Sequence, residues 1–526
     1  MPVNGSELTY NTNASAMQMA QAIFGSGVTV TRASYTGDSR SSAIWSNGDT
    51  ISPDVTPSDT GVILSTGYVT DFTQRNGDPN RSSSTSTNTS GRNGDDDFDD
   101  LAGTRTYDAA WLDVDFVPTG NVMTIQFVFS SEEYPEYVNS IYNDIVGVWV
   151  NGAPVDLVVG NGNTSVTNIN GNNNENLFIS NQNDDYNTEM DGFTVTMTLT
   201  FPVNPGVTNS IRIGIADASD SNYDSNLLIA GDSLQTSLIA MEDVVEMFPD
   251  QTRVVDVLSN DLNFTGGTLT ITHINGVAVS AGDTVTLASG EQVTLNADGT
   301  FSITADADTD TISFTYGIQS STGLTDTGFV TVTTVPCFVA GTRIATPDGH
   351  RPVEMLRPGD LVLTHDDGPQ PLRWVGRRSV AAMGAHAPIR ISAGAFGAHQ
   401  TLMVSPQHRV LVRDHLAELL FGDTEVLVAA KDLVNGRSVT IVEGGTVEYV
   451  HILFDRHQVV WSAGLATESF LPGPHVLGGF EAAVQQEICA IFPELDPRTG
   501  AGYSPAARRL LKGYEAQVLL SQAEAA

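Results

Sequence analysis

Hydrophobic and polar residues alternate with a period of two through much of the first 335 residues. Within residues 192–201, apolar side chains alternate with threonines, which places the apolar set on one face of a strand. The same alternation recurs at 125–129, 211–215 and 312–318, and clusters of Asn, Gly and Asp separate these segments. Many short strands between turn residues are typical of a β-sandwich or barrel. The sequence therefore predicts an all-β protein.

Changes in this pattern predict four parts. Residues 1–238 are Asn-rich and form an N-terminal β-sandwich, 239–336 form a small β-sandwich, and 337–477 form a third β domain. From residue 478 the apolar positions, including Ala507, Leu510, Leu511 and Tyr514, recur at spacings of three and four. This spacing predicts an amphipathic helical tail over 478–526.

A polar loop, residues 73–97, interrupts the first domain. It contains no aliphatic or aromatic residue and is rich in Ser, Thr, Asn and Gly. Because it has no apolar surface to bury, we expect it to be mobile. The acidic run at 95–100 offers carboxylates to calcium, but its spacing differs from that of an EF-hand loop, and a solvated charge run is the alternative.

The charge is distributed unevenly around Cys337. Residues 1–336 contain 8 Arg, no Lys and 42 acidic residues, whereas the remainder contains 16 basic and 20 acidic residues. Such a negative field repels phosphate backbones, so we expect cations rather than nucleic acid as partners. No apolar run is long enough for a membrane-spanning helix, and residues 1–25 lack the features of a cleavable secretory signal.

A lone cysteine such as Cys337 is usually a small buried hydrophobe. Here it begins the pattern Cys-Phe-x-x-Gly-Thr-x-Ile-x-Thr at 337–346, followed by a Pro-Asp-Gly turn and, at 404–412, Val-Ser-Pro-Gln-His-Arg-Val-Leu-Val. These blocks resemble the Hint domain, the self-processing module of inteins and hedgehog proteins. The resemblance implies a C-terminal Hint-type β domain that acts on its own chain.

The resemblance also implies a reaction. The Cys337 thiolate attacks the carbonyl of Pro336 and converts the amide to a thioester, while His408 protonates the scissile nitrogen and Ser405 orients it. The block at 449–460 implies a further histidine that assists cleavage. His457 is the first choice and His451 the second, and a role as a satisfied core residue is the alternative for both. This autoprocessing requires no cofactor.

Three departures limit the expected reaction. Residues 466–469 read Ala-Thr-Glu-Ser where splicing inteins carry a His-Asn pair, so we expect hydrolysis or transfer without ligation. The aspartate of hedgehog sterol transfer aligns near Arg377, which argues against sterol attachment. Pro336 constrains the attacked carbonyl and is expected to slow the acyl shift.

The first 336 residues show two further resemblances. Blocks at 37–42, 61–67 and 129–137 resemble a choice-of-anchor L domain, a family of bacterial extracellular proteins. Residues 241–335 resemble a cadherin-like or VCBS-type repeat with an Ig-like sandwich fold, marked by Val-Asp-Val-Leu-x-Asn-Asp at 255–261. These resemblances imply an adhesin-like head for an unknown cell-surface or matrix ligand, on a protein exported without a recognisable N-terminal signal.

Calcium is the possible cofactor of the head. Hard oxygen ligands are available from Glu132, Glu133, Asn143, Asp144, Asp217, Asp220 and Asp224. The alternative is that such acids only end strands. Taken together, the sequence predicts a secreted or cell-surface protein that cleaves its Pro336–Cys337 bond once, in a single turnover. The competing interpretation is a structural adhesin with an inert Hint scaffold.

Overall fold

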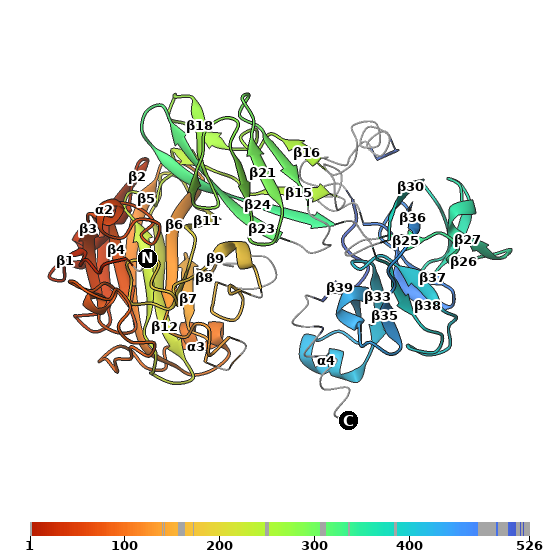
Figure 1. Ribbon diagram of the computed structural model, residues 1–526, viewed down its shortest axis with the longest axis horizontal. Helices are drawn as coiled ribbons and strands as arrows, with labels where there is room; N and C mark the ends of the chain where they lie inside the picture. Colours follow the sequence, from red (N-terminus) through yellow and green to blue (C-terminus); the bar gives the residue numbers. More distant parts are fainter. Residues whose placement is uncertain are drawn as a thin grey trace. The chain divides into compact units, whose positions relative to one another are not determined.

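The computed structural model describes residues 3–138, 140, 142–155, 164–171, 173–247, 252–305, 312–334, 337–382, 387–471, 491–492, 503–511, 516 and 519. The chain divides into two compact units. The first comprises residues 1–243, 254–303 and 312–331, and the second comprises 244–253, 304–311 and 332–526. Both consist mainly of strands (Figure 1), which confirms the predicted all-β class.

The N-terminal domain is a sandwich of two antiparallel sheets. An eight-stranded sheet has the order β1-β3-β4-β13-β6-β10-β9, with β11 also paired to β6, and a five-stranded sheet has the order β2-β5-β12-β7-β8. The strands are β1 (Thr9–Asn11), β2 (Val28–Thr36), β3 (Ser42–Ser46), β4 (Thr60–Ser65), β5 (Thr106–Pro118), β6 (Val122–Ser131), β7 (Ile145–Val150), β8 (Ala153–Pro154), β9 (Phe178–Ser180), β10 (Gly192–Thr194), β11 (Met197–Pro202), β12 (Asn209–Ala218) and β13 (Ser225–Ala230). Alternate residues of both sheets, such as Phe127 and Ile213, form one buried core.

Short helices complete this domain. They are α1 (Ala16–Ile23), α2 (Gly48–Ile51) and α3 (Asp96–Ala102), with 3-10 turns at Val69–Asp71 and Glu175–Leu177. Ser15 and Gln18 form a reciprocal capping box at the start of α1, which satisfies the free amides of its first turn.

The strand predicted at 192–201 is two strands rather than one. In β10, Phe193 lies opposite Ser130 of β6, whereas in β11 Met197 lies opposite Phe127. The pairing register therefore slips by one residue between them, and a slip of one residue ends a regular strand. The alternation of residue types continues through the break, so the pattern alone does not reveal it.

The middle of the chain adds short strands. These are β14 (Leu238–Ile239), β15 (Asp243–Met247), β16 (Thr252–Val255), β17 (Leu262–Asn263), β18 (Leu269–Ile274), β19 (Val277–Ala278), β20 (Thr284–Thr286), β21 (Gln292–Leu295), β22 (Phe301–Thr304), β23 (Ile312–Ser320) and β24 (Thr325–Thr334). The hairpin expected at 296–299 joins β21 to β22, and its Gly299 has a φ of +86° that side chains disfavour. Phe301, Phe314 and Tyr316 fill the core here.

The C-terminal domain contains two sheets. Its strands are β25 (Phe338–Val339), β26 (Arg343–Thr346), β27 (Gly349–Pro352), β28 (Leu361–Thr364), β29 (Gly368–Pro371), β30 (Trp374–Ala381), β31 (Ile389–Ile391), β32 (Leu402–Val404), β33 (Arg409–Arg413), β34 (Glu425–Ala429), β35 (Val439–Ile441), β36 (Thr446–Leu453), β37 (Val459–Ser462), β38 (Leu465–Glu468) and β39 (Arg509–Leu510). One sheet has the order β30-β36-β25-β32-β31-β35, and the other has β27-β26-β37-β38-β33-β34-β39 with β28 and β29 attached. A helix, α4 (His415–Phe421), follows β33, and 3-10 turns lie at Val353–Met355 and Ala430–Leu433.

The predicted helical tail is confirmed only in part: residues 491, 516 and 519 are helical, but residues 503–511 contain no helix. Arg509 and Leu510 form β39, which pairs in parallel with Val426 and Leu427 of β34. The free edge of β34 offers backbone hydrogen bonds to this segment, and that pairing overrides the helical spacing. Residues 472–490, 493–502 and most of 512–526 lie outside the described residues. In the described part of the chain, no helix is long and apolar enough to span a membrane.

Candidate functional site

The position of Cys337 follows from strand pairing. Cys337 immediately precedes β25, and Phe338 of β25 lies between Val404 of β32 and Val450 of β36. The residues that follow these two partners, Ser405 and His451, are consequently brought to Cys337. The short central strand therefore gathers residues that are more than 60 positions apart in sequence.

Ser405 contacts the nitrogen of the predicted scissile bond directly. The backbone N–H of Cys337 donates to Ser405 Oγ at 2.7 Å, and the N–H of Ser405 donates to the carbonyl of Cys337 at 2.9 Å. Pro336, the other side of that bond, lies outside the described residues. The structure thus brings together two of the predicted catalytic residues, with the hydroxyl rather than an imidazole on the nitrogen.

His451 is the histidine next to the thiol. Its Nε2 lies 3.4 Å from Cys337 Sγ, and its ring contacts Trp374 and Phe470. Burial raises the pKa of the Cys337 thiol well above its usual value, although a hydrogen bond from Ser405 and the charge of Arg378 oppose the rise. The thiol therefore stays protonated until a neighbouring base removes its proton, and His451 is in position to do so.

His408 is buried beside the residue that follows the nucleophile. Its ring centroid is 4.2 Å from that of Phe338, and neither ring nitrogen has a hydrogen-bond partner among the described residues. Burial lowers the pKa of His408 to about 4, the negative charge of Glu468 acts in the opposite direction, and nearby positive groups add to the decrease. His408 is therefore a neutral imidazole at neutral pH.

His457 is held in a different set of contacts. Its Nε2 lies 3.1 Å from the carbonyl of Ser469 and 3.5 Å from Glu468 Oε2, while its Nδ1 accepts the N–H of Ala507 at 2.9 Å. Its backbone N–H donates to Ser504 Oγ. Both ring nitrogens are engaged away from Cys337, so the assisting role predicted for His457 needs an intermediary.

Glu468 is the residue that sequence reasoning missed. It is 1% exposed at the end of β38, and its Oε1 accepts the N–H of Arg409 at 2.9 Å. Burial raises the pKa of Glu468, but Arg409 and His457 outweigh this and hold it below its usual value. The sequence offered one signal for it. Glu468 lies within the Ala-Thr-Glu-Ser stretch at 466–469, which stands where splicing inteins carry a His-Asn pair.

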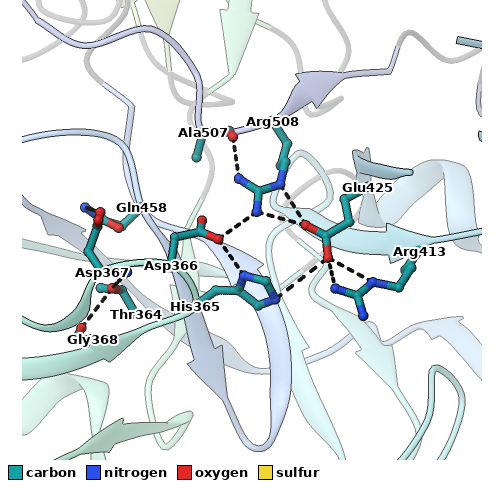
Figure 2. A network of polar contacts seen from close by, with 10 residues as sticks. All are labelled: Thr364, His365, Asp366, Asp367, Gly368, Arg413, Glu425, Gln458, Ala507 and Arg508. Carbon is teal, nitrogen blue, oxygen red and sulfur yellow. Dashed lines mark hydrogen bonds and ion pairs between the residues drawn. The ribbon is translucent and has the colours of Figure 1, made fainter. Parts of the chain in front are cut away.

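A polar network fastens the C-terminal segment (residues 503–511) to the same domain. Figure 2 shows Arg508 between Asp366, at 2.7 Å, and Glu425, at 2.8 Å; Glu425 also pairs with Arg413. His365 Nδ1 donates to Asp366 Oδ1 at 2.8 Å in the same network. The C-terminal segment, whose Ser504 and Ala507 contact His457, is therefore held in place by the ion pairs of Arg508.

The acids proposed as calcium ligands fall into separate groups. Glu132 is fully buried beside Glu189, Asp191 and Asp224, and neither of its carboxylate oxygens has a hydrogen-bond partner among the described residues. Burial, and after it the charges of the three neighbouring acids, raise the pKa of Glu132 to about 10. A buried carboxyl group in such surroundings binds either a proton or a cation.

The remaining proposed ligands have protein partners. The Asp144 N–H donates to Glu133 Oε2, and Asp144 accepts from Ser225 Oγ at 2.7 Å. Burial raises the pKa of Asp217, with Asp144 as its main charged neighbour. Asn143 accepts the N–H of Thr167, and Asp220 accepts the N–H of Asn222. Within the described ranges, no three His, Cys, Asp or Glu side chains are arranged to ligate one metal ion. Calcium binding stays a prediction.

The polar loop is anchored rather than free, which corrects the prediction of a mobile segment. Its backbone amides donate to buried carboxylates: Arg81 to Glu189, Thr87 to Asp224, Thr89 to Asp108 and Ser90 to Asp38. Composition predicted mobility because the loop buries no apolar surface, but buried carboxylates from other parts of the domain hold its backbone in place. The acidic run at its end begins α3: Asp95 caps the helix and Asp97 pairs with Arg212 at 2.6 Å.

Comparison with protein families accounts for three successive parts of the chain. Family models match a choice-of-anchor L domain at residues 7–235, a bacterial Ig domain at 235–333 and a Hint domain at 336–474. The chain thus contains these three domains in this order, which confirms the resemblances found in the sequence. The choice-of-anchor and Ig domains indicate a modular protein of the cell surface or extracellular space.

Solved structures similar to part of the chain include inteins. The MchDnaB-1 intein is 13% identical, with 25% of this chain and 98% of that one covered and a TM-score of 0.18. A bacterial intein-like domain from Clostridium thermocellum is 16% identical, with 25% and 97% covered and a TM-score of 0.19. No curated protein matches the chain.

Proposed function

We propose that this modular surface protein cleaves its own chain at the Pro336–Cys337 bond by an N-to-S acyl shift. The observation that carries the proposal is the pair of contacts at Cys337. Its backbone nitrogen is bonded to Ser405 Oγ at 2.7 Å, and its sulfur lies 3.4 Å from His451 Nε2. A nucleophile with a base on its sulfur and a hydroxyl on the leaving nitrogen has the groups that acyl transfer from an amide requires.

The first step makes a thioester. His451 takes the thiol proton, and the Cys337 sulfur forms a bond to the carbonyl carbon of Pro336, whose electron pair moves to the carbonyl oxygen. When that pair returns, the C–N bond breaks. As the nitrogen becomes tetrahedral, its lone pair turns toward the Ser405 hydroxyl, which gives it a proton. The Ser405 oxygen then takes back a proton, the one that His451 removed from the thiol.

The second step releases the head. Water, or another nucleophile, attacks the thioester carbonyl, and the sulfur leaves as the Cys337 thiol. The products are residues 1–336 with a new carboxyl end and residues 337–526 with a new amino end. Because residues 466–469 contain no asparagine to cyclise, the fragments are not rejoined. His408 and His457 assist in this proposal without touching the sulfur, and no cofactor takes part.

Mass spectrometry of the purified full-length protein tests the proposal. We expect wild type to yield fragments that end at Pro336 and begin at Cys337, faster when a thiol is added, and Cys337→Ala to stay intact. Cys489→Ala is the matched control and should cleave like wild type, because only Cys337 begins the Hint pattern. Wild-type protein that stays whole in all these conditions contradicts the proposal.

One observation favours a second function, a structural adhesin with an inert Hint scaffold. Cys337 is only 3% exposed, and burial raises its pKa, so its sulfur resembles that of a core cysteine. In that case Cys337→Ala leaves the fragment pattern unchanged.

We further propose that the N-terminal domain is an adhesin-like head for a cell-surface or matrix ligand, with calcium as its candidate cofactor. The match to a choice-of-anchor L domain supports a surface role, and the excess of acidic over basic residues before Cys337 disfavours nucleic acid as a partner. Pull-down of intact host or bacterial surface material, with and without a chelator, tests this role; capture by the C-terminal fragment alone contradicts it.

A further inference from the structure

Glu468 is a buried carboxylate that the proposed cleavage does not yet use. It ends β38 and is 1% exposed. Its Oε1 accepts the N–H of Arg409, and the Arg409 guanidinium lies 3.5 Å away. Its Oε2 lies 3.5 Å from His457 Nε2 and has no hydrogen-bond partner among the described residues. Burying a carboxylate this deeply costs folding free energy, so we ask which neighbouring groups its charge serves.

The ring of His457 is oriented toward Glu468 by the C-terminal segment. A backbone amide always donates, so the bond from Ala507 N–H requires Nδ1 of His457 to be the acceptor. The proton of the neutral ring therefore sits on Nε2, which faces Glu468 and the carbonyl of Ser469. In this tautomer the Nε2 proton is donated to the carbonyl of Ser469 and lies near the carboxylate, so it favours the charged form of Glu468.

On its other side Glu468 influences His408. The charged and titratable groups that act on the pKa of His408 are Glu468 from β38, His451 from β36, the neighbouring Arg409, and His457 from the loop after β36. Of these four, Glu468 alone carries negative charge. It is also tied to the backbone of Arg409, the residue that follows His408. Glu468 is therefore the group that supports a protonated His408, and the positive charge of Arg409 opposes it.

We propose that Glu468 is a positioning residue of the Hint site, which His457 and the C-terminal segment hold in place so that its charge supports a transient imidazolium at His408. The His408 ring packs on Phe338, the residue after the nucleophile, and the backbone N–H of His408 donates to the carbonyl of Ser405. A positive charge on His408, at the end of β25 next to Cys337, stabilises the negative charge that develops on the Cys337 nitrogen as it leaves. This inference rests on the proposed cleavage.

Histidine ring NMR in the full-length Cys337→Ala protein tests the inference separately from cleavage. We expect Glu468→Gln to lower the titration midpoint of His408 by about 1 pH unit or more, which is the usual effect of losing an adjacent opposite charge. Glu425→Gln is the matched control: it is another buried carboxylate of this domain, but it pairs with Arg413 and Arg508 and does not face His408. An unchanged His408 midpoint in Glu468→Gln overturns the inference.

The rate of fragment formation in the wild-type background gives a second readout. We expect Glu468→Gln to slow cleavage about tenfold or more and to shift the pH dependence of the rate to lower pH, while Glu468→Asp recovers part of both. If Glu468→Gln does not fold, Glu468→Asp decides, and a wild-type rate and pH profile in that variant overturns the inference. If wild type itself does not cleave, the cleavage proposal fails while the NMR titration still tests Glu468.

Discussion

At Cys337, the burial that protects the thiol also keeps it protonated. A thiol with a raised pKa has almost no thiolate at neutral pH, and only the thiolate attacks a carbonyl. The base that shares its pocket therefore controls its reactivity. In the proposed cleavage His451, 3.4 Å from the sulfur, is that base, whereas His408 packs against Phe338 and both ring nitrogens of His457 are engaged elsewhere.

Replacing His451 should consequently affect cleavage more than replacing His457. We expect His451→Gln to slow thioester formation by about 100-fold or more, the range for loss of a general base. Fragment formation followed by mass spectrometry at neutral pH measures this effect. A wild-type rate in His451→Gln would show that another group removes the thiol proton.

Ser405 gives a second prediction, because its hydroxyl accepts the hydrogen bond of the scissile nitrogen. Ser405→Ala removes a hydrogen-bond acceptor from that buried N–H, which costs about 1–3 kcal/mol, and it removes the proton source for the leaving amine. We expect cleavage to slow by about tenfold or more, and Ser405→Thr to preserve it because a hydroxyl remains. Equal rates in Ala and Thr variants would assign Ser405 a purely structural role.

Cys337 and Ser405 lie in contact and His408 packs against Phe338, but the sequence could not rank the two later histidines. That ranking depends on register: Val450 lies opposite Phe338, so the next residue, His451, reaches Cys337, whereas His457 lies beyond the end of β36. The sequence could not predict a role for Glu468 for the same reason, since its contacts with Arg409 and His457 depend on how β38 pairs with its neighbours.

Among the elements, regular alternation predicted strands well, and segments stabilised by distant partners were predicted poorly. The polar loop is anchored by carboxylates such as Asp224 and Glu189, which lie more than 100 positions away. The C-terminal segment is extended because β34 has a free edge there, although its own spacing favours a helix. In both cases the deciding interaction is absent from the local sequence.

The acids beneath the polar loop predict a pH dependence of the N-terminal domain. The folded state holds a proton on Glu132 up to a pKa of about 10, whereas an unfolded glutamate releases it near pH 4.3. The folded state thus binds more protons between these values, so stability falls as pH rises through this window. Glu132→Gln should weaken the fall in melting temperature that calorimetry records for wild type between pH 5 and pH 8.

Calcium provides the control for that experiment. If a cation replaces the proton, millimolar calcium should raise the melting temperature of wild type at pH 8 and leave that of Glu132→Gln unchanged. An equal response of both proteins would remove Glu132 from the predicted calcium ligands.

At the scale of the whole molecule, the proposed cut coincides with the change in charge. Residues 1–336 carry 8 basic and 42 acidic residues and hence a net charge of −34, while the remainder carries 16 and 20 and hence −4. We expect anion-exchange chromatography of cleaved protein to resolve two species, with the N-terminal fragment eluting at much higher salt. Co-elution of both fragments would mean that they stay associated after the bond is broken.

The pairing of β39 with β34 also bears on how the protein behaves in concentrated solution. A strand with an unpaired edge is a template for other chains, and β34 is rich in the Val and Leu residues that promote such stacking. Within the described C-terminal domain, β39 occupies that edge and the ion pairs of Arg508 hold it there. The C-terminal segment that orients His457 therefore also covers an edge at which other chains could pair.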